Sequence, residues 1–108
     1  MLQIILLQHA DGHWKLDEIL AEHLGVELED LLQRLAGLTE PAEHSAAEFE
    51  SCWATTLALV FLETRHAEDR DEWALVAAKA RTWLAAAALP GLSLEQLREH
   101  AEKVIGGE

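Results

Sequence analysis

The chain has 108 residues, half of them hydrophobic, which is enough to bury one core and argues against disorder. Twenty acidic against eight basic side chains give a net charge of −12. Because such a surface repels phosphate backbones, we expect no nucleic-acid partner. The single cysteine excludes an internal disulfide and a zinc site of several cysteines. No targeting signal and no apolar run of membrane-spanning length is present, which favours a cytoplasmic protein without membrane insertion.

In chain order, the predicted elements are all helical. Apolar residues recur at the helical spacing, and the sustained alternation typical of strands is missing. A short apolar segment at 2–8 is followed by predicted helices at 16–24, 27–36, 45–66, 69–88 and 93–106. Gly25 and Gly37 are placed as the stops of the first two of these helices. The prediction is an all-α protein, a compact bundle of about five to six helices forming one domain over residues 1–108.

Three of these helices begin with capping boxes, at Ser45–Glu48, Asp69–Glu72 and Ser93–Gln96. The helix at 45–66 is apolar on nearly every side between Cys52 and Leu62, which is typical of a central helix covered by its neighbours. The helix at 69–88 is amphipathic, and Trp73 and Trp83 lie in its apolar stripe. We expect these two helices to pack antiparallel at the centre of the fold.

Candidate chemistry is sparse. Glu63 and His66 form one Glu-x-x-His pair, whereas di-iron bundles need two such pairs and two further carboxylates. A capping or surface role is expected for them. His9, Asp11 and His13 are close in sequence, but the glycine between the last two breaks any shared helix face. We therefore predict no catalytic residues, no cofactor site and no metal site.

The stretch from Gln8 to Trp14 fits the pattern Q-x-x-x-G-x-W after an apolar segment. Gly12 permits a tight turn, the Gln8 amide can bond loose backbone groups, and Trp14 can close over the helices. We expect these residues to clasp the N-terminal segment to the bundle. The pattern resembles the QW motif of triterpene cyclases, which implies an alternative: a small-ligand-binding or enzymatic helical unit related to α/α toroid proteins.

A second resemblance covers nearly the whole chain. It is carried by Gln8, Asp11, Gly12, Trp14, Thr56, Trp73, Lys79 and Trp83. With these residues the sequence resembles the C-terminal helical region of proteins that carry VIT and von Willebrand type A domains. In the vault poly(ADP-ribose) polymerase the similar region is the major-vault-protein interaction domain. The resemblance implies a non-catalytic tethering module whose partner is a vault-like shell protein or another domain of a VIT/von Willebrand type A protein. The Ala-rich, acid-rich composition looks bacterial.

A partner surface is expected on the leucine-rich helix at 27–36. Residues 1–50 hold more leucines than a short helix pair can bury, and they carry eleven acids against two bases. The residues predicted to bind a partner are Leu28, Leu31, Leu35, Glu27 and Glu29. A flat or grooved apolar patch would favour the interaction module. A pocket lined by Trp14 and several ionisable groups would favour the toroid-related alternative. The oligomeric state is left open.

Overall fold

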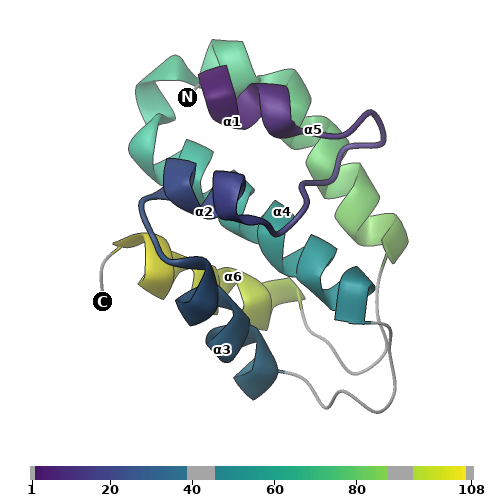
Figure 1. The fold of residues 1–108 in the computed structure, drawn as a ribbon. Coiled ribbons are helices and arrows are strands. Elements are labelled where there is room, and N and C mark those ends of the chain that lie inside the picture. Colours follow the sequence, from purple (N-terminus) through teal and green to yellow (C-terminus); the bar gives the residue numbers. More distant parts are fainter. Residues whose placement is uncertain (1, 39–45, 88–93, 107–108) are drawn as a thin grey trace.

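The computed structural model describes residues 2–38, 46–87 and 94–106, which form six α-helices and a short 3-10 turn without a strand (Figure 1). The elements are α1 (Leu2–Leu7), α2 (Glu18–Leu24), α3 (Leu28–Leu38), α4 (Ala46–Arg65), η1 (Ala67–Asp69), α5 (Arg70–Ala87) and α6 (Leu94–Gly106). The radius of gyration, 12.8 Å, is close to the ~13 Å of a compact chain of this size. The prediction of an all-α bundle is confirmed.

Helix α4 is the centre of the fold. Every residue from Cys52 to Val60 is buried, because α2, α3, α5 and α6 all pack against this helix. A helix that is apolar all round needs such a covering, and the predicted central helix is confirmed. The expected pair of α4 and α5 is present, and α6 contributes a second large contact with α4 that the sequence did not indicate.

The ends of α2 follow from local chemistry. The Asp17 carboxylate accepts a hydrogen bond from the Leu20 amide at 2.9 Å, which satisfies one of the unpaired N–H groups at the helix start. Gly25 ends the helix in the left-handed conformation, with φ at +80°, as predicted. The prediction that Gly37 stops α3 is wrong, because the helix continues through it to Leu38. A glycine inside a helix costs about 1 kcal/mol, which packing can offset.

Two of the predicted capping boxes fall outside the described residues at their first member, Ser45 and Ser93. The third lies where a helix begins as predicted: α5 starts at Arg70, directly after Asp69. The 3-10 turn Ala67–Asp69, which was not predicted, leads into it from the end of α4. This turn lets α5 fold back along α4 (Figure 1).

Glu63 links three helices. Its Oε2 accepts a hydrogen bond from Arg81 Nη2 of α5 at 2.9 Å, and its Oε1 lies 2.7 Å from Arg98 Nη1 of α6. Arg98 also donates from Nε to Glu102 at 3.1 Å. The Glu63 side chain is 21% exposed, so the ion pairs are partly shielded from water. The Glu63 carboxylate therefore joins the outer helices to α4.

Candidate functional site

The loop between α1 and α2 folds back on itself and against α5. The Gln8 side-chain amide donates to the Gly12 carbonyl at 3.0 Å and to the Val76 carbonyl of α5 at 2.9 Å. Within the loop, the His9 amide donates to the His13 carbonyl at 2.8 Å, and the Gly12 amide donates to the His9 carbonyl at 2.9 Å. One glutamine amide thus closes the loop and attaches it to a helix 68 positions further along the chain.

Gly12 lies where the loop touches α5. Its φ is +109°, a backbone conformation that residues other than glycine rarely adopt. A Cβ added there would stand 2.5 Å from the Lys79 carbonyl oxygen. That oxygen is part of the α5 backbone and cannot swing aside as a flexible side chain could. The position therefore requires glycine for two separate reasons, its dihedral angle and the close approach of the helix.

Trp14 joins α1 to α4. Its side chain is fully buried, and the indole N–H donates to the Ile4 carbonyl at 2.8 Å. The last carbonyls of a helix have no partner within the helix, so this bond satisfies one of them at the end of α1. The Trp14 backbone amide donates to the Thr55 hydroxyl at 3.0 Å, and that hydroxyl donates to the Ser51 carbonyl of α4 at 2.7 Å.

On the outer side of the loop, three aromatic rings are stacked. The His13 ring lies 5.0 Å from the Trp83 ring and 4.4 Å from the His9 ring. Asp11 accepts hydrogen bonds from the His13 backbone amide and pairs with the His13 ring. Desolvation raises the pKa of Asp11, but these contacts with His13 outweigh it, and the pKa lies below its usual value. Trp83, expected in the core stripe, is only half-buried and packs against the His13 ring of this loop.

We call the contact of residues 8–14 with α1, α4 and α5 the clasp. Six of the residues that carry the family resemblance meet there, although they come from both ends of the chain: Gln8, Asp11, Gly12, Trp14, Lys79 and Trp83. The other two brace the helices. The Thr56 hydroxyl donates to the Cys52 carbonyl at 2.8 Å, and the Trp73 indole donates to the His66 carbonyl at 2.7 Å. Sequence reasoning missed Thr55 and Val76. Thr55 contributes its hydroxyl group and Val76 its backbone carbonyl, and no sequence motif marks either position.

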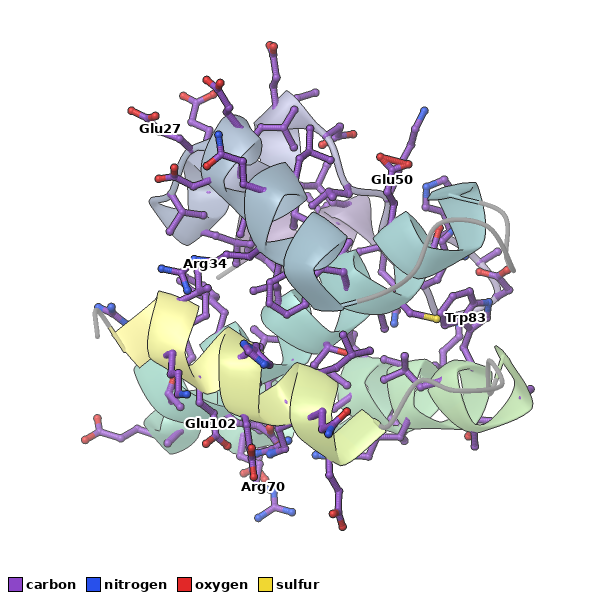
Figure 2. All side chains as sticks on the ribbon, turned by 90° about the horizontal axis from the view of Figure 1, so that it is seen from below. Glu27, Arg34, Glu50, Arg70, Trp83 and Glu102 are labelled. Atoms are coloured by element: carbon purple, nitrogen blue, oxygen red, sulfur yellow. The ribbon has the colours of Figure 1, made fainter. Side chains whose placement is uncertain are left out.

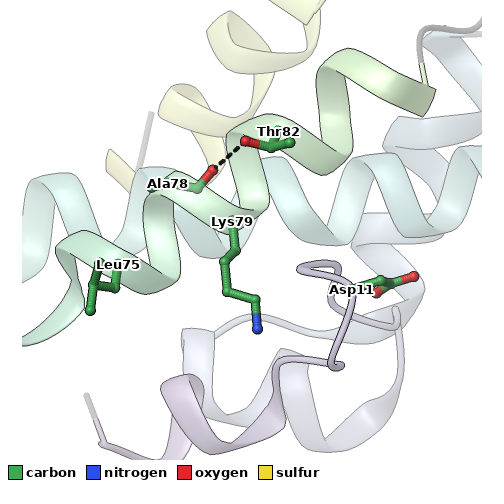
Figure 3. Close-up of a pocket in the computed structure, with 5 residues that line it drawn as sticks. All are labelled: Asp11, Leu75, Ala78, Lys79 and Thr82. Atoms are coloured by element: carbon green, nitrogen blue, oxygen red, sulfur yellow. Dashed lines mark hydrogen bonds between the residues drawn. The ribbon is translucent and has the colours of Figure 1, made fainter.

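Beside the clasp lies an open pocket of about 440 Å³, lined by Asp11, Leu75, Ala78, Lys79 and Thr82 (Figure 3). The Lys79 side chain extends from α5 toward the loop that carries Asp11. Leu75 is 83% exposed, and Trp14 does not line the pocket because it is buried beneath the loop. The pocket is therefore an apolar hollow on a helix surface with one basic and one acidic side chain at its edge.

The predicted partner surface is only partly accessible. Glu27 and Glu29 are exposed, and Leu28 is half-buried against the core. The expectation for Leu31 is wrong: its side chain is fully buried and its carbonyl accepts a hydrogen bond from the Trp53 indole at 3.0 Å. The core needs the middle of the leucine stripe, so a partner cannot reach it. The Leu35 side chain lies outside the described residues.

Helices α2 and α3 nevertheless carry exposed side chains, which we call together the acidic face of α2 and α3. Its apolar members are Ile19, 54% exposed, and Leu32, 39% exposed. Its exposed acids are Glu18, Glu22, Glu27, Glu29 and Asp30. Figure 2 shows Glu27 pointing away from the bundle. The face thus combines exposed apolar side chains with a dense negative charge.

Within the described residues, no three His, Cys, Asp or Glu side chains are placed to hold a metal ion. His9 and His13 belong to the ring stack described above, and Asp11 pairs with His13. None of the helices in this part of the chain is long and apolar enough to cross a membrane.

The homologues found for this chain are von Willebrand factor A domain-containing proteins, which supports that part of the resemblance. The sequence is 42% identical over 78% of its length to von Willebrand factor A domain-containing protein 5A of Rattus norvegicus. It is 36% identical over 80% of its length to the Homo sapiens protein of the same name. A von Willebrand factor A domain-containing protein of Dictyostelium discoideum is 35% identical over 76%.

The chain spans only 9%, 10% and 4% of these relatives, respectively. The three relatives are eukaryotic, so they lend no support to the bacterial character expected from composition. No family model and no solved structure matches the chain. The similarity therefore concerns one small segment of much larger proteins.

Proposed function

We propose that this chain is a non-catalytic protein-interaction module that tethers a larger protein to its partner. The observation that carries the proposal is the exposure of Ile19 and Leu32 on the acidic face of α2 and α3. Three of the four tryptophans, Trp14, Trp53 and Trp73, are buried, so the fold can sequester large apolar side chains. Apolar side chains left in contact with water and surrounded by charge are typical of protein interfaces.

The proposed partner presents a basic segment with apolar side chains. The exposed acids attract lysine and arginine across distances of about 10 Å at ordinary ionic strength, and they repel acidic proteins. The apolar contacts at Ile19 and Leu32 then hold the complex together, because dissociation is governed mainly by buried anchors. The single cysteine, Cys52, is buried in α4, which is compatible with action in the reducing cytoplasm.

For the identity of the partner, two classes follow from the family resemblance. One is another domain of a von Willebrand type A protein, and the other is a vault-like shell protein. The first is favoured because the relatives contain a von Willebrand factor A domain by name, and because this chain spans only 9% and 10% of the Rattus norvegicus and Homo sapiens proteins. A module of this size within a long polypeptide has neighbouring domains at high effective concentration.

The toroid-related alternative, a ligand-binding or enzymatic unit, receives less support. That function needs a concave pocket in which several ionisable groups converge on a ligand. The clasp tryptophan, Trp14, is buried and uses its N–H to bond Ile4. The pocket beside the clasp is open and offers only Asp11 and Lys79 as ionisable groups.

Affinity capture from cell extract with quantitative mass spectrometry tests the proposal. The immobilised wild-type domain is compared with the double variant Ile19→Asp/Leu32→Asp and with Leu75→Glu as a matched control on another helix. We expect at least one protein to be retained by the wild type and the control and lost with the double variant. Equal capture by all three proteins would contradict the proposed surface.

Titration of the labelled domain with a purified von Willebrand factor A domain, and separately with a purified vault shell protein, identifies the partner class. The charge-reversal variant Glu27→Lys/Glu29→Lys should change the salt dependence of binding and leave the complex detectable, because exposed charges mainly tune association. If charge reversal abolished binding and the Ile19 and Leu32 changes had no effect, the acids would be the true anchors.

A further inference from the structure

Helix α5 carries a second apolar seam on the side that faces away from α4. The buried side of α5 contains Trp73, Ala77, Ala80 and Leu84. The opposite side contains four exposed side chains that follow each other at the three- and four-residue spacing of one helix face: Leu75, Ala78, Thr82 and Ala86. We call these four the outer seam. Three of its members, all except Ala86, line the open pocket beside the clasp.

Leu75 is the feature of the outer seam that most needs a partner. It is 83% exposed, the highest value among the large hydrophobic side chains of the described residues. The next two members of the outer seam, Ala78 and Thr82, are small (Figure 3), so another helix can approach α5 closely beside Leu75. Because a two-fold contact brings the same side chains of two copies together, a protruding leucine flanked by small residues can pack against its own copy.

Charges beside the outer seam fit the same arrangement. Glu72 and Lys79 are seven residues apart, so they lie two turns apart along the same edge of α5. Both are exposed, and neither is paired with an opposite charge within the described residues. When two identical helices cross antiparallel, the like edges of the two helices face each other. Glu72 of each copy then stands opposite Lys79 of the other.

We propose that two copies of this chain associate through the outer seams of α5, packed antiparallel about a two-fold axis near Leu75. Leu75 of each copy packs against Leu75 and Ala78 of the other, and two Glu72–Lys79 ion pairs flank the contact. The acidic face of α2 and α3 takes no part in this contact, so the self-association is independent of the partner binding proposed above.

The association is weak. One 18-residue helix offers less than the ~800 Å² per partner that a standard stable interface buries. Each copy also carries a net charge of −12, and this repulsion opposes association. We expect a dissociation constant of about 10 µM to 1 mM in solution. Within a longer polypeptide held at high local concentration, a contact of this strength is sufficient to pair two modules.

Sedimentation equilibrium of the whole chain, up to about 2 mM protein at ~0.15 M salt, tests the proposal. The wild type should fit a monomer–dimer equilibrium. Leu75→Glu should weaken dimerisation by at least about tenfold, because it places one carboxylate from each copy in the apolar contact. Ile19→Glu is the matched control: it removes an exposed apolar side chain from α2 and should leave dimerisation unchanged. Circular dichroism checks that both variants remain helical.

A charge exchange tests the antiparallel register. Glu72→Lys and Lys79→Glu should each weaken the dimer, because each sets like charges opposite one another, and the double variant should restore it. A wild type that stays monomeric at the highest concentration overturns the proposal. It is equally overturned if Leu75→Glu dimerises like the wild type. The same holds if the double variant loses as much dimer affinity as the two single variants together, instead of regaining the affinity of the wild type.

Discussion

Replacing Trp14 measures how much of the protein's stability depends on the clasp. The side chain is fully buried, and truncating a buried tryptophan to alanine costs about 3–5 kcal/mol. The change also leaves the Ile4 carbonyl at the end of α1 without its 2.8 Å hydrogen bond. Because a domain of this size is stable by about 5–15 kcal/mol, Trp14→Ala should lose a large part of its stability at room temperature.

A graded series separates the ring from its hydrogen bond. Trp14→Phe keeps most of the apolar volume and removes the N–H donor, so an unpaired Ile4 carbonyl costs about 1–3 kcal/mol. Trp83→Ala is the control, since Trp83 is half-buried and its stacking on His13 is worth about 1 kcal/mol. The expected order of destabilisation is Trp14→Ala, then Trp14→Phe, then Trp83→Ala.

Urea unfolding followed by circular dichroism at the helix minimum gives the free energies of unfolding. For Trp14→Phe, a loss of about 1–3 kcal/mol lowers the midpoint by about 1–2 M, given slopes typical of small domains. Unchanged midpoints in both Trp14 variants would refute the reasoning, because a fully buried, hydrogen-bonded tryptophan cannot be removed without cost. A larger loss for Trp83→Ala than for Trp14→Ala would place the clasp's stability in the outer ring stack instead.

Gly12→Ala should destabilise by more than Gly25→Ala: both have positive φ and incur about 1–3 kcal/mol of backbone strain, but only at Gly12 does the new Cβ meet the Lys79 carbonyl. Equal urea midpoints for the two variants would show that α5 yields to the methyl group. Glu63→Gln should cost about 1 kcal/mol, less at high salt, because it removes the charge that holds two arginines. Leu31→Asp should abolish the cooperative thermal transition, since it buries a carboxylate in the core; a folded variant would mean that α3 can turn its leucine face outward.

The helices could be predicted because their signals are local. The apolar run of α4 and the glycine that ends α2 depend on neighbours within a few positions, and both are present as predicted. The start of α2 was predicted at Leu16, but Asp17 caps the helix and it begins at Glu18. The wrong predictions for the partner surface have a different cause. A stripe of leucines on α3 shows which side is apolar, but not how much of that side the core covers. The Trp53 indole bonds the Leu31 carbonyl, and Leu31 is buried while its neighbour Leu32 remains exposed.

The motif of the clasp could be predicted from the sequence, but the atoms that it contacts could not. Gln8, Gly12 and Trp14 stand out by their spacing, yet the atoms they meet do not. The Val76 and Thr55 atoms that bond the loop are a backbone carbonyl and a threonine hydroxyl on two other helices. Nothing in the sequence around those positions marks them, because any residue supplies a carbonyl. Only the packing of α5 against α4 brings them to the loop.

Apart from Lys79, the side chains that carry the family resemblance are distinct from those proposed to bind. Gln8, Gly12 and Trp14 are turned inward and occupied by bonds within the fold, whereas the proposed contacts use Ile19 and Leu75 on exposed helix faces. An identity of 36–42% with von Willebrand factor A domain-containing protein 5A therefore supports a shared scaffold, and it leaves the partner to be set by other residues. Changes on the acidic face can redirect binding without disturbing the clasp, because the two share no contacts on α5.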